Sequence, residues 1–85
     1  MPIIIGRQCV KIVRYLKRTN GENPITYLQI GQAISLFGGT SDKVRDKYRE
    51  ALFTTLGLLE KIENTDTFRI NESKLNNIEL TYLGL

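Results

Sequence analysis

Residues 44–60 read VRDKYREALFTTLGLLE, and this stretch decides the fold that we expect. Its apolar residues follow one another at spacings of four, three, one and four, which places them on one face of an α-helix. They are Val44, Tyr48, Ala51, Leu52 and Leu56. Gly57 ends this helix, because glycine adopts the left-handed conformation of a helix C-terminus at little cost. A new apolar segment starts at once, so a long helix and a strand meet at one glycine.

The sequence after Gly57 predicts a β-hairpin. Residues 58–63 (LLEKIE) and 67–71 (TFRIN) are short stretches rich in apolar and β-branched residues, as is typical of strands. Between them lies Asn64-Thr65-Asp66, which consists of residues that favour tight turns. We therefore expect a two-stranded hairpin across residues 58–71.

Another helix precedes residues 44–60. Residues 28–37 carry apolar side chains at helical spacing, and a glycine pair at positions 38 and 39 ends the pattern. Residues 25–27 (ITY) predict a minimal strand before this helix, with Thr26 as its candidate N-cap. Residues 40–42 (TSD) supply hydroxyl and carboxylate caps for the next helix, which we expect over residues 41–56.

The two ends of the chain differ in how clearly they can be interpreted. An apolar face predicts a helix over residues 6–19, which Asn20-Gly21 ends. This face comprises Ile5, Cys9, Ile12, Val13 and Leu16. Residues 78–83 alternate as a strand does, yet the tail also fits a helix with Leu75, Ile78, Tyr82 and Leu85 on one face. The pattern leaves both interpretations of the tail open.

The predicted order is a helix, a short strand, a helix, a glycine turn, a helix and a hairpin, and it resembles the winged helix-turn-helix superfamily. Residues 25–34 (ITYLQIGQAI) are similar to the strand and second helix of that superfamily, and residues 44–59 to its recognition helix and first wing strand. The segment LGLLE at residues 56–60, where the helix ends and the strand begins, is the most specific part of the match. Lys43 departs from the pattern, because many members carry a hydroxyl residue directly before the first buried valine. The resemblance covers about residues 6–71.

The resemblance implies an α+β fold in which a three-helix core carries a C-terminal β-hairpin, the wing. It also implies binding to double-stranded DNA, with the helix over residues 41–56 in the major groove. In residue composition the chain resembles small transcriptional regulators of archaea, their viruses and plasmids. We expect one domain over residues 1–85, with its core at about 6–71 and a tail at 72–85 that is a candidate dimerisation element.

The composition is that of an ordinary globular domain. Of the 85 residues, 41% are hydrophobic and 25% are charged, so disorder is not expected. One cysteine and no histidine exclude an intrachain disulfide and a thiol-based metal cluster, and remove the commonest general base. Arg7 and Lys11 interrupt the apolar start of the chain, so neither an export signal nor a membrane span is expected. We expect an intracellular protein that is not an enzyme and uses no metal, cofactor or small-molecule substrate.

The helix expected over residues 41–56 carries the first candidate site. Its outward face should present Ser41, Asp42, Arg45, Asp46, Arg49 and Phe53. Arg45 and Arg49 are the candidate base readers, because arginine binds guanine bidentately in the major groove. The candidate phosphate contacts are Ser41, Lys43 and Lys47. In the competing interpretation this is a solvated face on which each arginine pairs with the aspartate three residues before it.

The second candidate surface is a row of four basic residues, which we name the basic row. Arg7, Lys11, Arg14 and Arg18 are spaced by four, three and four, so they line one face of the first helix opposite its apolar face. Residues 1–19 contain no acid, and like charges at this spacing repel one another. Flanking bent DNA, a second protomer or an acidic protein could compensate the row, and a solvated outer face is the competing interpretation.

The predicted hairpin carries a third candidate surface. Lys61 and Arg69 lie on its strands, and Asn64 and Thr65 lie at its tip, where they are candidates for contacts to phosphate or the minor groove. Acidic residues flank the tip at positions 63 and 66 and argue against strong binding in the minor groove. The competing interpretation is an ordinary hairpin turn.

These features predict a sequence-specific double-stranded DNA-binding protein, a transcriptional regulator. The alternative is a winged helix that contacts proteins. The nearly balanced charge of residues 41–56 favours this alternative, whereas the net charge of +3 favours nucleic acid. One such domain reads only a few base pairs, so we expect a homodimer on a palindromic site. The candidate dimer interface is the apolar tail, at Leu75, Ile78, Leu80, Tyr82, Leu83 and Leu85. In the competing interpretation some of these residues, such as Ile78 and Leu80, instead close the core of their own protomer against the first helix.

Overall fold

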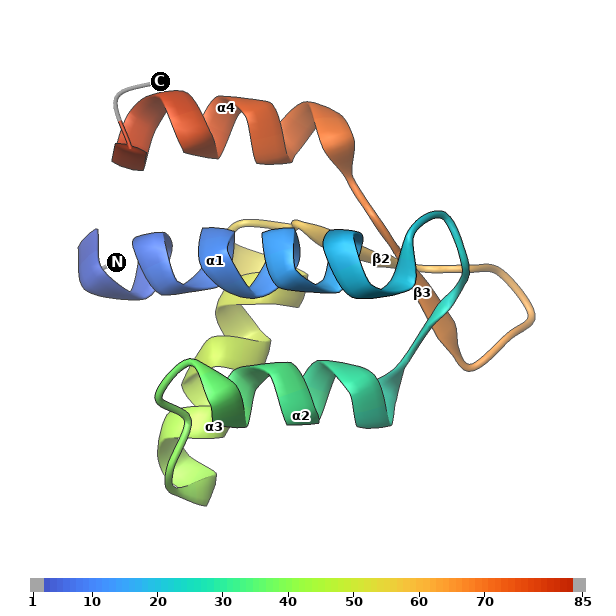
Figure 1. The fold of residues 1–85 in the computed structure, drawn as a ribbon, viewed down its shortest axis with the longest axis horizontal. Coiled ribbons are helices and arrows are strands. Elements are labelled where there is room, and N and C mark those ends of the chain that lie inside the picture. The colour runs from blue at the N-terminus through green and yellow to red at the C-terminus, as the bar shows by residue number, and fades with distance from the viewer. Residues whose placement is uncertain (1–2, 84–85) are drawn as a thin grey trace.

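A computed structural model describes the backbone of residues 3–83 and the side chains of residues 5–78. Within these residues the chain forms a small α+β domain with four α-helices and a three-stranded antiparallel sheet. The elements are α1 (Ile3–Asn20), β1 (Ile25–Thr26), α2 (Tyr27–Leu36), α3 (Asp42–Glu50), the π-helical segment η1 (Ala51–Thr55), β2 (Leu59–Lys61), β3 (Thr67–Ile70) and α4 (Glu72–Leu83). Helix α1 lies between α2 and α4, and η1 crosses behind it (Figure 1).

Local capping interactions fix where α2 begins. The Thr26 hydroxyl accepts a hydrogen bond from the Gln29 backbone N–H at 3.2 Å, and the Gln29 side-chain oxygen accepts one from the Thr26 N–H at 2.9 Å. This reciprocal capping box satisfies two N–H groups that a helix start otherwise leaves unpaired. The predicted N-cap is therefore confirmed. The observed helix begins and ends one residue before the expected 28–37.

We expect Thr26→Ala to lower the free energy of unfolding by about 1 kcal/mol, because the substitution removes the hydroxyl that caps the Gln29 N–H. Urea unfolding followed by circular dichroism measures the change. Thr54→Ala is the matched control, since Thr54 is exposed. Equal losses in the two variants would contradict the importance of the cap.

The helix expected over residues 41–56 is not a single α-helix. It starts at the predicted cap, where the Ser41 hydroxyl accepts from the Val44 N–H at 3.3 Å, and it stays α-helical to Glu50. Over Ala51–Thr55 the winding widens to a π-helix, as in the bond from the Leu56 N–H to the Ala51 carbonyl at 2.8 Å. Gly57 then ends the helix at φ +61°, as predicted.

The π-helical turn corrects the prediction for Phe53. The sequence placed this residue on the outward face, but the structure half-buries it against Phe68, with ring centroids 5.0 Å apart. A π-turn accommodates an extra residue and so rotates the side chains around the helix axis relative to an ideal 3.6-residue period. Phe53 thereby joins the sheet to the helix instead of facing solvent.

The predicted hairpin is part of a three-stranded sheet in the order β1-β3-β2. The minimal strand β1 pairs antiparallel with β3, so that Ile25 lies opposite Phe68. Strand β3 is therefore central, and the expected two-stranded hairpin gains a partner from before α2. This pairing ties the start of α2 to the wing-like loop that joins β2 and β3.

The tail forms a helix, α4, which packs along α1 (Figure 1). Leu75 is buried in the core of its own domain and Ile78 packs against that core, so Leu75 is not a residue of the predicted dimer interface. The same burial explains why the helix forms, because it covers apolar surface that a strand would leave exposed. The other predicted interface residues, Leu80, Tyr82, Leu83 and Leu85, lie outside the described side chains.

The core is assembled from α1, α2, the α3–η1 helix, the sheet and α4. The predicted apolar face of α1 is buried at Cys9, Ile12, Val13 and Leu16, and only Ile5 remains half-buried. Val10 is also buried, on the side of α1 that the sequence pattern did not assign to the core. No helix among the described residues has the length and apolar character needed to cross a membrane.

Cys9 should resist alkylation in the native protein. Burial raises the pKa of its thiol to about 12, since the charged thiolate is disfavoured away from water. Iodoacetamide at about pH 8.5 should therefore label Cys9 only after unfolding. Since the folded pKa exceeds the unfolded one, the thiol stabilises the fold below about pH 9, and this contribution declines towards pH 12. Fast labelling without denaturant would contradict the assignment.

Candidate nucleic-acid interface

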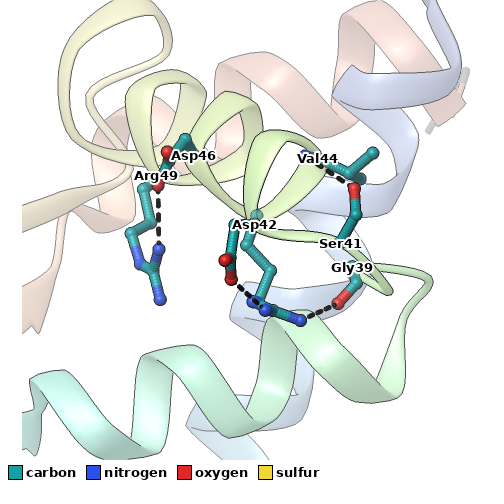
Figure 2. A network of polar contacts seen from close by, with 7 residues as sticks. Gly39, Ser41, Asp42, Val44, Asp46 and Arg49 are labelled. Atoms are coloured by element: carbon teal, nitrogen blue, oxygen red, sulfur yellow. Dashed lines mark hydrogen bonds and ion pairs between the residues drawn. The ribbon is translucent and has the colours of Figure 1, made fainter.

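The two arginines predicted to read bases lie between α3 and α2. Arg45 donates from Nη1 to the Gly39 carbonyl at 3.0 Å and from Nη2 to Asp42 (Figure 2). Its side chain is 27% exposed, whereas that of Asp42 is 94% exposed. Arg45 thus stabilises the turn that precedes α3, and the carboxylate of Asp42 projects into solvent.

Arg49 lies one turn further along α3 in a similar environment. Its Nη1 donates to Asp46 at 3.1 Å (Figure 2). Its guanidinium lies 5.3 Å from the centre of the Tyr27 ring. The Arg49 side chain is 24% exposed and the Asp46 side chain 74% exposed. The Arg49 Nε is buried without a hydrogen-bond partner among the described residues. Both ion pairs of the competing interpretation are therefore present.

The other predicted phosphate contacts lie around the same helix. Lys43 and Lys47 are exposed on the side of α3 away from Arg45 and Arg49. The Ser41 hydroxyl is exposed but already accepts the Val44 N–H. Around the axis of α3, the acidic side chains of Asp42 and Asp46 therefore lie between the two arginines, which are beside α2, and the two lysines on the opposite side.

A shallow groove of about 340 Å³ separates α2 from α3. Besides Arg45 and Arg49 it is lined by Tyr27, Leu28, Gly31, Gln32 and Ser35, which the sequence analysis did not assign to a site. A methyl group at Gly31 would lie 3.6 Å from the Arg49 Nη2, an ordinary van der Waals distance, so Gly31 lies directly beside the guanidinium. The signal was present in the sequence, because the small and polar residues of α2 recur on the face opposite Ile30, Ala33 and Ile34.

The wing-like hairpin divides its predicted contacts between two faces. Lys61 lies opposite Phe68 in the β2–β3 register, so both side chains point to one face of the sheet. Phe68 packs against Phe53 and Tyr27, which places Lys61 on the side of α3. Arg69 points to the other face, where it pairs with Glu60 at 3.1 Å.

The tip of the hairpin is a tight turn held by its own side chains. Asn64 adopts φ +62°, and the Thr65 hydroxyl donates to the Ile62 carbonyl at 2.8 Å. Thr65 also lies within hydrogen-bonding distance of the Thr67 hydroxyl, at 2.8 Å. The amide of Asn64 is exposed at the tip, whereas the Thr65 hydroxyl already serves the turn. Asn64 is therefore the more accessible of the two predicted contacts.

The basic row lies on a different side of the domain from α3. Its four residues, Arg7, Lys11, Arg14 and Arg18, are all exposed on the face of α1 opposite Cys9, Ile12 and Val13. Arg18 lies 5.8 Å from the centre of the Tyr15 ring. Lys17, on the flank of the row, pairs with Glu72 of α4 at 3.0 Å. The structure thus separates two candidate surfaces that the sequence alone could not place relative to each other.

The described residues contain no cluster of three or more His, Cys, Asp or Glu side chains that could hold a metal ion. Comparisons with protein-family models, with curated proteins and with solved structures find no match for this chain.

Proposed function

We propose that this protein is a winged helix-turn-helix protein that binds double-stranded DNA in a sequence-specific way and acts as a transcriptional regulator. The observation that carries the proposal is the exposed α3, which is capped at Ser41, joined to α2 by a short glycine turn and placed on the same side as Lys61 of the hairpin. An exposed second helix of such a pair, with a hairpin beside it, has the shape that enters a major groove.

In the proposed complex α3 lies in the major groove. Arg45 and Arg49 leave their aspartates and bind base edges, while Lys43 and Lys47 contact phosphates. Lys61 and Asn64 bind the backbone beside the groove, and the Ser41 hydroxyl adds a phosphate contact at the start of α3. Arg69 faces away from α3 and makes the smallest contribution of the predicted wing residues.

A second function, contact with a partner protein, is favoured by the surface of α2. Leu28 is 70% exposed and Leu36 is 64% exposed, and Leu28 lines the groove beside α3. Exposed large apolar residues beside a groove are more typical of protein interfaces than of DNA interfaces. A protein partner would therefore bind α2 and the groove.

Selection of duplexes from a random pool at physiological salt, followed by a salt titration, tests the proposed function. We expect enrichment of one sequence class and a steep loss of affinity with salt, because lysines and arginines displace counterions from phosphates. Absence of any duplex binding at low salt would reject the proposal and leave the protein-interaction function.

We further propose that two copies bind a palindromic site, with half-sites about one helical turn apart. Since Leu75 belongs to the core, removing the tail would unfold the domain, and the test must use the full chain. Sedimentation at micromolar concentration and footprint symmetry measure the assembly. A monomer that protects an asymmetric site would exclude the dimer.

A further inference from the structure

The basic row on α1 is a surface that the proposed function does not use. Arg7 and Arg18 are 11 positions apart, so the row extends roughly 16 Å along the helix axis. All four side chains are exposed, and α1 contributes no acidic residue to its own surface. Like charges at this spacing repel one another, so this surface of α1 favours a ligand of opposite charge.

The basic row and the exposed face of α3 point in different directions. Helix α1 and the α3–η1 helix bury their inner faces in the same core, where Cys9 of α1 and Tyr48 of α3 are both buried. Figure 1 shows η1 passing behind α1. The outer face of each helix thus looks away from the other. The basic row therefore faces away from a straight duplex that is seated on the outer face of α3.

The chemistry of the α1 surface favours a polyanion over a protein. Protein interfaces are built around large apolar or aromatic anchors. The large apolar residues that are exposed within the described part of the chain are Tyr27, Leu28 and Leu36, and all three belong to α2. The α1 surface has cations at intervals of one helical turn, about 5–6 Å, which suits a run of phosphates.

We propose that the basic row binds the phosphate backbone of a second DNA duplex, so that one protein molecule bridges two DNA segments. The inference rests on the proposed function for the first duplex, which α3 holds. The second contact carries no sequence specificity, because the row meets phosphates and no base edge. Bridging of this kind brings a specific site next to any other stretch of DNA.

A two-duplex capture experiment tests this inference. One duplex with the selected sequence is fixed to beads, and retrieval of a labelled random duplex is measured at low salt. We expect the native protein to retrieve the second duplex. A variant with Arg7→Gln, Lys11→Gln, Arg14→Gln and Arg18→Gln should retrieve at least about tenfold less, yet bind the single selected duplex within about threefold of the native affinity.

The matched control replaces two exposed cations of α3, Lys43→Gln and Lys47→Gln. It should weaken binding to the single selected duplex, which the basic-row variant leaves intact. Urea unfolding establishes that both variants fold.

The remaining outcomes separate the two proposals. Undiminished retrieval by the basic-row variant would overturn the bridging inference. A loss of affinity for the single selected duplex that parallels the loss of retrieval would also overturn it, because the row then contacts flanking DNA of the same duplex. Native protein that binds one duplex and never retrieves a second also overturns it. Retrieval without any preference for the selected sequence, unaffected by the α3 substitutions, would instead overturn the proposed function and leave the basic row as a DNA-binding surface.

Discussion

Replacing Leu52 by alanine should lower the free energy of unfolding by about 2–5 kcal/mol. Leu52 lies in the π-helical segment η1, is fully buried, and belongs to the core cluster that joins α1, α2 and the sheet. Truncation removes apolar contacts and leaves a cavity that a close-packed interior fills only in part. Because small domains are stabilised by only about 5–15 kcal/mol, the loss is a large share of the total. Urea unfolding at 25 °C measures it.

Leu36→Ala is the matched control for this prediction. The chemistry of the substitution is the same, but Leu36 is 64% exposed at the end of α2, so its loss should change stability by no more than about 0.5 kcal/mol. Similar losses in the two variants would show that the helix containing η1 does not pack into the core as described. A selective loss in Leu52→Ala supports the position of η1, which the sequence did not predict.

The features that could be predicted from the sequence are those with a local cause. Thr26 and Ser41 cap their helices through hydrogen bonds to residues three positions away, and Gly57 ends a helix through its own φ angle. The apolar face of α1 follows from a regular period. In each case the residues that determine the structure are neighbours in sequence, so the pattern carries the information.

The features that escaped prediction depend on contacts distant in sequence. The sequence predicted the minimal strand at residues 25–27 but not its pairing with β3, in which Ile25 lies opposite Phe68. It also did not predict η1, which turns Phe53 onto the same phenylalanine. The pattern left the tail open between a strand and a helix, and the burial of Leu75 in the core decides for the helix. Packing decides such outcomes, because a short apolar segment can bury its side chains either as a helix or as a strand.

The candidate site shows the same division. The sequence correctly indicated that Arg45 and Arg49 share one side of α3, because helical spacing is local. Their partial burial depends on α2, since Gly31 and the ring of Tyr27 lie beside the guanidinium of Arg49. The predicted contacts at Lys61 and Arg69 separated for a similar reason, because strand register puts them on opposite faces.

Replacing Arg49 by alanine should cost about 1–3 kcal/mol of binding to the selected duplex and relax its preference at particular base pairs. Arginine makes bidentate bonds to a guanine edge, and its buried Nε has no partner among the described residues in the free protein, so the side chain has a donor to offer. Competition binding against duplexes with single changes measures the loss. Lys43→Ala is the control, since a lost phosphate contact weakens all sequences about equally and flattens the salt dependence. Equal losses on selected and random duplexes would remove Arg49 from base reading.

Asp46→Asn should have the opposite effect on random DNA. In the free protein Asp46 pairs with Arg49 at 3.1 Å and projects its carboxylate into solvent on the face that meets DNA in the proposed complex. The amide is of similar size but lacks the charge, so it releases Arg49 and removes a repulsion towards phosphates. Affinity for random duplex should rise by roughly two- to fivefold, as expected for one exposed charge pair.

The selected duplex should gain less than random DNA from Asp46→Asn, because its base contacts already compensate for breaking the pair. The ratio of the affinity for the selected duplex to the affinity for random duplex therefore falls in this variant. In the native protein Asp46 thus weakens nonspecific binding. Glu50→Gln removes an equal charge from the exposed surface of α3 without touching the Arg49 pair, so it separates simple charge from release of the arginine. If Glu50→Gln lowers the ratio as much as Asp46→Asn, the pair has no special role. If Asp46→Asn weakens both duplexes, the carboxylate itself accepts a hydrogen bond from a base, as cytosine can supply.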